Sequence, residues 1–215
     1  QLAFELAPLG VRFDDDHLDR AYWAAAAELS GIHQQHRDIS AEARTVLYMR
    51  HLDEGLPDRL DDAAWERLHR AVLTPALELP PVPMPGALET LEAVKGLGVP
   101  TCLISNAGIT PGFVLREVLD RYGMLAHLDH TVFSDEVELS KPAAAIFERA
   151  LDEFGVPADA AAFLGDQPVL DVLGPQAVGM WTVQIGDIAE DGIAPHARID
   201  ALSGLVPALG SLGLL

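Results

Sequence analysis

Two aspartates follow a short apolar run in the last third of the chain. Residues Ala161–Leu164 carry no polar break and predict a buried strand, and Gly165 ends it. Asp166 comes next and Asp171 follows five positions later. Ligands of open α/β sheets lie outside the carboxyl ends of the strands, so both carboxylates fall where a site is expected, and they suit Mg²⁺. The alternative is a helix cap at Asp166 and a solvated acid at Asp171.

Other polar groups follow further predicted elements. Ser105 and Asn106 end the apolar run Thr101–Ile104, and the loop after them offers backbone N–H groups that can hold an anion. Lys141 precedes a predicted helix and is a point charge for a phosphate. A hydroxyl, a lysine and a cation site are the parts that hold and neutralise a phosphoryl group. Taken singly, Ser105 and Asn106 read as loop residues that bond their own backbone, and Lys141 as a surface lysine.

The first part of the chain reads as helices. Apolar residues at helical spacing follow three residues that suit an N-cap, namely Asp14, Ser40, and Asp61 or Asp62. Gln1–Leu9 reads as the tail of an earlier helix. The proline cluster Leu79–Gly86 breaks any helix or strand, so we place a domain boundary there, with residues 1–79 as a helical domain and residues 80–215 as a second domain.

The second part alternates between strands and helices. Strands are expected at 101–104, 131–133, 161–164 and 181–185, and helices at 87–97, 113–122 and 142–154. This alternation predicts an α/β fold with a doubly wound parallel sheet, a Rossmann-like core. The apolar, glycine-rich residues Ala201–Leu215 are expected to pack on this core or on a partner.

Composition limits the function classes. The chain has 215 residues, is 49% hydrophobic and carries a net charge of −19. Such a charge disfavours nucleic acid or an anionic membrane as a partner, because both require basic patches. Cys102 is the one cysteine, so no internal disulfide forms. The sequence shows no signal peptide and no apolar run of about 18 residues, so we expect a cytoplasmic protein that does not cross a membrane. The oligomeric state stays open.

Three motifs in this order resemble the haloacid dehalogenase (HAD) superfamily of hydrolases, in its phosphatase-like branch. They are Ile-Ser-Asn-Ala at 104–107, Ser-Lys-Pro at 140–142 and Leu-Gly-Asp-x4-Asp at 164–171. The resemblance covers about Pro85–Ile185. It implies a HAD-like core with a helical cap of the C1 type. It also implies that Ser105 binds a phosphoryl oxygen beside Asn106, that Lys141 stabilises the charge, and that Asp166 and Asp171 hold Mg²⁺.

The first motif of the family, Asp-x-Asp-Gly-Thr at the end of a strand, does not occur in this sequence. Asp14 and Asp16 have the spacing, but they read better as the acidic start of a helix. The resemblance implies instead that the nucleophile lies upstream of Gln1, on a segment of about 20–30 residues. Loss of the motif is the other reading. In this fold the motif strand lies in mid-sheet, so its deletion would leave two unpaired edges and a slot in the core. We therefore expect a strand to be supplied there.

The function implied by the resemblance is that of a Mg²⁺-dependent phosphatase, which acts on a small phosphorylated metabolite through an aspartyl-phosphate. A phosphomutase or a 2-haloacid dehalogenase on the same scaffold is an alternative, as is a non-catalytic binding protein that lacks the nucleophile. His33 and His36, three positions apart, have a spacing that can ligate a metal. No third partner accompanies them, so a solvated or substrate-facing role is favoured.

Overall fold

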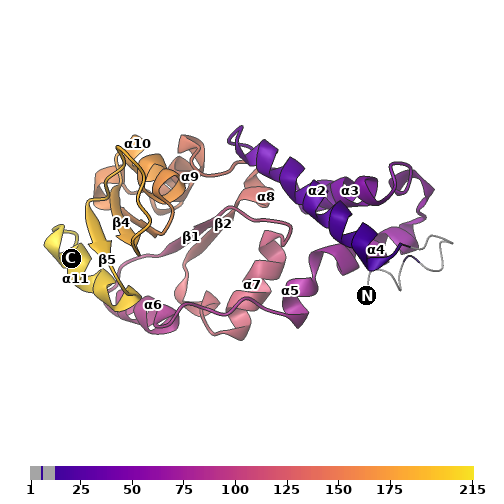
Figure 1. Cartoon of the computed structure of the whole chain (residues 1–215). Coiled ribbons are helices and arrows are strands. Elements are labelled where there is room, and N and C mark those ends of the chain that lie inside the picture. Colours follow the sequence, from indigo (N-terminus) through magenta and orange to yellow (C-terminus); the bar gives the residue numbers. More distant parts are fainter. Residues whose placement is uncertain (1–5, 7–12) are drawn as a thin grey trace.

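The computed structural model describes Leu6 and residues 13–215. Its first part is helical, and these helices form one end of the molecule (Figure 1). They are α2 (Asp15–His33), α3 (Ala41–Leu52), α4 (Asp62–Leu73) and the short α5 (Pro75–Glu78). The helix tail predicted at Gln1–Leu9 lies outside the described residues, apart from Leu6.

Side-chain caps explain where the first three of these helices begin. Asp14, Ser40 and Asp61 each accept a hydrogen bond from the backbone N–H three residues later. Such a bond satisfies one of the free donors at a helix N-terminus. The predicted starts of these helices are therefore confirmed.

The helices α2, α3 and α4 share a hydrophobic cluster of their own, which includes Ala25, Met49 and Leu68. After α5, residues 80–84 form neither helix nor strand, as the proline cluster predicts. The division of the chain into domains at residue 79 stays a prediction. Within the described residues, no helix combines the length and the apolar character that a membrane crossing requires.

The second part is built from parallel strands and helices. The strands are β1 (Cys102–Ser105), β2 (His130–Phe133), β3 (Ala162–Gly165), β4 (Trp181–Ile185) and β5 (Ala197–Ile199). The helices are α6 (Ala87–Gly96), α7 (Gly112–Arg121), α8 (Ser134–Val137), α9 (Ala144–Phe154), α10 (Gly174–Ala177) and α11 (Leu205–Ser211). All strand pairs are parallel, which confirms the predicted α/β class.

The strands form two sheets. One has the order β1-β2 and the other β3-β4-β5, and no strand of the described residues lies between β1 and β3. Helix α9 covers both sheets, since one buried cluster contains Ile104 and Val132 from the first sheet and Phe163 from the second. The Phe147 ring of α9 meets the Phe163 ring edge-on, with the centroids 5.3 Å apart. The two sheets therefore share one core although their facing edges are unpaired.

The C-terminal residues pack on the protein itself. Helix α11 contacts β5 and α6. Its residues Ala208 and Leu209 are buried in one cluster with Val183, Ile185 and Ile199. Of the two alternatives, packing on the core or on a partner, the structure shows packing on the core.

Candidate active site

Ser105 is the last residue of β1, and Asn106 begins the loop that follows. The Ser105 side chain is half-buried, and its hydroxyl makes no hydrogen bond with any other described residue. Asn106, in contrast, braces two loops. Its Oδ1 accepts from the Lys141 backbone N–H at 2.7 Å, and its Nδ2 donates to the Lys141 carbonyl at 3.0 Å. The end of β1 is thereby fixed beside Lys141, with the Ser105 hydroxyl free.

The Lys141 ammonium is held by Asp171. Its Nζ lies 2.6 Å from Asp171 Oδ1, and the two side chains are only 12% and 5% exposed. The other carboxylate oxygen of Asp171 accepts from the backbone N–H groups of Asp166 and Gln167, at 3.1 and 3.0 Å. Three donors therefore surround this carboxylate, which explains why Asp171 is buried and not solvated.

Local backbone structure brings Asp171 into this position. Asp171 lies on a π-helical segment, Pro168–Leu173, that continues into α10. π-Helical segments are rare in proteins, but those that occur are often found at functional sites. Gly165 leaves the necessary space, because a Cβ built on it would lie 2.3 Å from the Asp171 Cγ. The glycine that ends β3 is therefore required for the close approach of this carboxylate.

Asp166 is the carboxylate that remains available. It is exposed, and its side chain forms no hydrogen bond or ion pair within the described part of the chain. Its carbonyl accepts from Nε2 of the buried Gln184, whose Oε1 has no partner there. Mg²⁺ binds through one or two carboxylates and keeps several waters, so Asp166 fits such an ion. The described residues contain no cluster of three or more His, Cys, Asp or Glu that could hold a metal without such waters.

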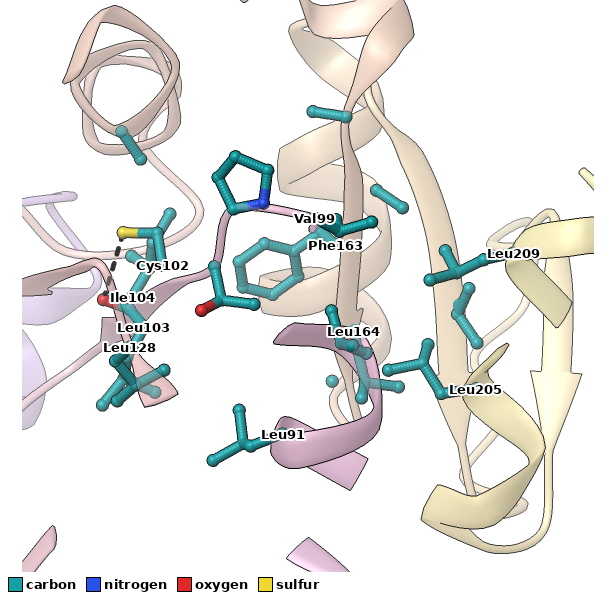
Figure 2. Close-up of a pocket in the computed structure, with 18 of the residues that line it drawn as sticks. Leu91, Val99, Cys102, Leu103, Ile104, Leu128, Phe163, Leu164, Leu205 and Leu209 are labelled. Carbon is teal, nitrogen blue, oxygen red and sulfur yellow. Dashed lines mark hydrogen bonds between the residues drawn. The ribbon is translucent and has the colours of Figure 1, made fainter. Parts of the chain in front are cut away.

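A cavity of about 600 Å³ runs from these charged groups into the protein, between β1 and β3. Lys141, Asp166 and Asp171 line one part of it. Apolar side chains line most of the rest, among them Leu103, Phe163, Leu164 and Leu205 (Figure 2). A cavity between β1 and β3 is therefore present in the described part of the chain, and it opens at the candidate site.

Comparison with known proteins agrees with this arrangement. A family model described as "haloacid dehalogenase-like hydrolase" matches residues 5–179, which is most of the chain. The chain belongs to the haloacid dehalogenase-like hydrolases. The predicted family and fold class are thereby confirmed.

Curated relatives are hydrolases of this kind. Haloacid dehalogenase-like hydrolase domain-containing protein 3 of Mus musculus is 30% identical over 133 residues, 59% of this chain and 51% of that protein. The pyrimidine 5'-nucleotidase YjjG of Escherichia coli is 33% identical over 132 residues, 57% of this chain and 55% of that protein. The glyceraldehyde 3-phosphate phosphatase of Methanothermobacter thermautotrophicus is 32% identical over 120 residues, 56% and 52% of the two chains. The chain spans about half the length of these relatives.

Solved structures share the fold. A 2-haloacid dehalogenase from Pseudomonas syringae matches with a TM-score of 0.67 at 22% identity, over 98% of this chain and 88% of that one. A HAD phosphatase from Thermococcus onnurineus matches with a TM-score of 0.58 at 24% identity, over 97% and 92% of the two chains. At these identities the likeness extends to the fold alone.

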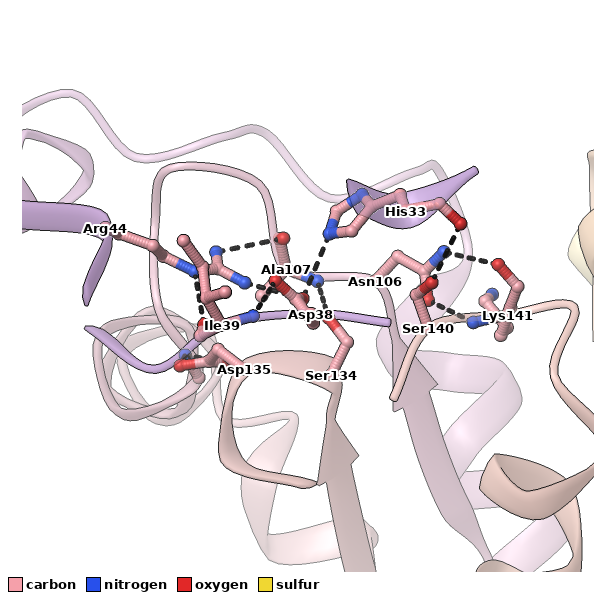
Figure 3. A network of polar contacts seen from close by, with 11 residues as sticks. His33, Asp38, Ile39, Arg44, Asn106, Ala107, Ser134, Asp135, Ser140 and Lys141 are labelled. Carbon is pink, nitrogen blue, oxygen red and sulfur yellow. Dashed lines mark hydrogen bonds and ion pairs between the residues drawn. The ribbon is translucent and has the colours of Figure 1, made fainter. Parts of the chain in front are cut away.

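The N-terminal helical part of the chain is joined to the loops of the candidate site by a buried ion pair that was not predicted from the sequence. Asp38 is buried and lies 2.6 Å from Nη2 of Arg44 and 3.0 Å from Nε2 of His33 (Figure 3). Arg44 Nη1 donates to the Ala107 carbonyl at 2.9 Å, in the loop after Ser105. Burial raises the pKa of Asp38, but hydrogen bonds from His33 and Ser134 and the charge of Arg44 hold it below its ordinary value.

A second set of contacts joins the stretch between α2 and α3 to the loop before Lys141; together with the contacts of Asp38 and Arg44, we call these contacts the seam. Ser140 Oγ donates to the His33 carbonyl at 3.2 Å, and its backbone N–H donates to the His36 carbonyl at 3.3 Å. Arg37 and Leu139 form an isolated antiparallel bridge. The stretch between α2 and α3 is therefore attached to the loops on both sides of the candidate site.

The side chains of four other candidate residues do not reach Ser105, Lys141, Asp166 or Asp171 through any hydrogen bond or ion pair of the described residues. His33 Nε2 faces Asp38, while His36 is exposed with φ 60°, so the two imidazoles do not form a metal pair in this structure. Asp14 caps α2, and Asp16 is an exposed residue of its first turn. The reading of Asp14 and Asp16 as an acidic helix start is confirmed.

Proposed function

We propose that this hydrolase is a Mg²⁺-dependent phosphatase of a small phosphorylated metabolite. The observation that carries the proposal is the Lys141–Asp171 ion pair beside the free Asp166 carboxylate, at the carboxyl ends of β1 and β3. One cation and one open carboxylate suit a substrate that is itself an anion and is bound together with a metal. Relatives named as phosphatases and as a nucleotidase support this substrate class.

Ser105 and Lys141 bind the phosphoryl group. The free Ser105 hydroxyl donates to a phosphoryl oxygen, and Asn106 holds the loop in place through its two bonds to Lys141. Asp171 fixes the Lys141 ammonium, so this charge needs no reorganisation when negative charge develops on the phosphoryl oxygens. Local positive charge is needed here, because the chain carries a net charge of −19.

Asp166 would hold the metal, with waters and substrate oxygens completing its coordination. A bound Mg²⁺ neutralises phosphoryl charge. The family resemblance implies that Asp171 is a Mg²⁺ ligand together with Asp166. The contacts of Asp171 favour a different role, in which it positions Lys141 and the 165–167 loop.

The nucleophile in this proposal is an aspartate outside the 215 residues, as the family resemblance implies. Its carboxylate oxygen bonds to phosphorus while the ester oxygen leaves, and water then cleaves the aspartyl-phosphate. Asp14 is a poor candidate, since its carboxylate accepts the His17 N–H at the start of α2. The helices up to residue 79 act as the cap that selects the substrate.

The test uses the protein isolated from its natural source. We expect an intact mass above 23.1 kDa and hydrolysis of p-nitrophenyl phosphate that requires Mg²⁺. Asp166→Asn should abolish this hydrolysis, whereas the exposed Asp152→Asn on α9 serves as the matched control and should leave it unchanged. Full activity of Asp166→Asn, or hydrolysis that EDTA does not lower, would refute the metal assignment. No turnover of any phosphate ester would refute the phosphatase.

A further inference from the structure

Arg44 holds three acceptors through one buried guanidinium group (Figure 3). Its Nη2 lies 2.6 Å from Asp38 Oδ2, and its Nε donates to the Ile39 carbonyl at 3.0 Å, both in the stretch between α2 and α3. Its Nη1 donates to the Ala107 carbonyl at 2.9 Å, in the loop after Ser105. A guanidinium is planar and presents its donors in a fixed fork, so it sets the positions of these acceptors relative to one another.

Ala107 is held at both of its backbone groups. Its carbonyl accepts from Arg44, and its N–H donates to Ser134 Oγ at 2.7 Å. The Ser134 hydroxyl in turn bonds Asp38, the partner of Arg44. Ala107 and Ser134 are both 0% exposed, so water offers their polar groups no alternative partner. The four residues therefore form a closed, buried ring between the N-terminal helical part and the α/β part.

This ring begins two residues after Ser105. The residue between them, Asn106, is bound through its side chain to the backbone of Lys141. Because Asn106 and Ala107 are both fixed, the peptide groups that follow Ser105 are fixed as well. The Ser105 hydroxyl is the group of this turn that keeps no partner within the described part of the chain. Its direction therefore depends on how firmly the two following residues are held.

We propose that Arg44 is a positioning residue of the candidate site, which holds Ala107 and thereby keeps the Ser105 hydroxyl directed at the phosphoryl group. This role rests on the proposed function, since that function assigns the phosphoryl contact to Ser105. Arg44 acts through the loop and not on the substrate, because its guanidinium is buried and occupied by protein acceptors. The stretch between α2 and α3 thus completes the phosphoryl-binding loop from the other part of the chain.

A displaced Ser105 hydroxyl affects turnover more than substrate binding. Negative charge develops on the phosphoryl oxygens in the transition state, so a donor aimed at them contributes more to kcat than to KM. A displacement of about 1 Å can lower the rate about a hundredfold. Lys141 and Asp166 keep their own contacts and continue to hold the bound substrate. Loss of the Arg44 contacts should therefore lower kcat and leave KM within about twofold.

The experiment uses the protein encoded by its complete natural gene, with Mg²⁺ and p-nitrophenyl phosphate. Arg44→Lys keeps the positive charge beside Asp38, but an ammonium cannot match three acceptors arranged around a planar guanidinium. We expect kcat to fall at least about tenfold, with KM and the far-UV circular dichroism unchanged. Arg50→Lys makes the same change at an exposed position of the same helix and should alter neither kcat nor KM.

A second variant removes both buried charges, and it carries the test if Arg44→Lys does not fold. In Asp38→Asn combined with Arg44→Met, no buried ion is left without its partner, a change that is often neutral for stability. The Ala107 carbonyl then has no donor from the helical part. We expect the same loss of kcat. Hydrogen exchange of the Ala107 amide, followed by NMR, should become at least about tenfold faster, because the loop opens locally.

Several results would overturn the proposal. They are an unchanged kcat in the folded variants, an unchanged exchange rate at Ala107, and a rise in KM without a fall in kcat, which would place Arg44 in substrate binding. Unfolding of both variants would make Arg44 a purely structural residue and would refute the proposal as well. No hydrolysis of a phosphate ester by the wild type would refute the proposed function and this role with it. An active wild type with unaffected variants refutes the role of Arg44 alone.

Discussion

Replacing Asp171 by asparagine tests how much the buried contact between the two loops of the site contributes to stability. The carboxylate meets three donors, the Lys141 ammonium on Oδ1 and the N–H groups of Asp166 and Gln167 on Oδ2. An amide offers one acceptor oxygen and one NH₂ group. In either orientation the NH₂ faces a donor, so the ammonium or both backbone N–H groups lose their partner.

The size of the expected loss in the free energy of unfolding follows from the burial of this ion pair. Leaving one member of a buried ion pair without its partner costs about 3–5 kcal/mol. Domains of this size are stable by about 5–15 kcal/mol, so Asp171→Asn should remove about a fifth or more of the free energy of unfolding. In urea unfolding followed by circular dichroism, the midpoint should fall while the m-value stays the same.

A matched control separates burial from charge. The Arg121–Glu117 pair has the same N–O distance of 2.6 Å, but its side chains are 46% and 52% exposed. Glu117→Gln should therefore cost only about 0.3–0.5 kcal/mol. Adding Lys141→Met to Asp171→Asn should recover part of the loss, because the unpaired ammonium is then gone. If Asp171→Asn costs no more than Glu117→Gln, the reasoning about this site is refuted.

Three further predictions use the same structure. Gly165→Ala should lower the unfolding midpoint, because its Cβ would lie 2.3 Å from the Asp171 Cγ, whereas Gly96→Ala, with no neighbour within 4 Å, should not; equal midpoints would contradict the close approach. The pKa of Asp38 is depressed in the folded state, so its contribution to stability is present above the unfolded pKa and is lost as pH falls through the folded value. Melting temperatures between pH 5 and 3 should therefore fall more steeply for the wild type than for Asp38→Asn, and parallel curves would count against this. Burial raises the pKa of the Cys102 thiol to about 11, so its alkylation rate by iodoacetamide should still increase above pH 9.5, and a plateau near pH 9 would disprove the shift.

Apolar runs and capping residues were sufficient to predict the strands and helices in which they occur. The run Trp181–Ile185 is apolar enough to define β4 with the observed bounds, and Ser40 and Asp61 cap the helices that they were predicted to start. The strands predicted at 101–104 and 161–164 are shifted by one residue at both ends, and the one predicted at 131–133 begins one residue earlier. The motif residues Asn106, Lys141, Asp166 and Asp171 do meet, because the carboxyl ends of parallel strands share one edge of the sheet.

Features that depend on distant pairing were not predictable from the sequence. The strand β5 has three residues, and its exposed middle residue Arg198 gives no apolar run. Asp171 was predicted to be a Mg²⁺ ligand, with a solvated acid as the alternative, since nothing local shows that three donors converge on it. Arg44 and Ala107 are 63 positions apart. Their bond follows from the placement of the stretch between α2 and α3 against the loops of the candidate site, which no local pattern encodes.

The contacts around Asp38 limit where substitutions can change the substrate preference of such proteins. The stretch from His33 to Arg44 lies in the N-terminal helical part, yet its contacts with Ala107 and Ser140 attach it to the loops of the α/β part. A substitution there disturbs the fold and the site together. Trp23, on the outer side of α2, is 69% exposed and carries no such constraint. Evolutionary divergence and directed libraries therefore have freedom along the outer faces of the N-terminal helices, whereas the contacts around Asp38 are inherited together with the loops of the candidate site.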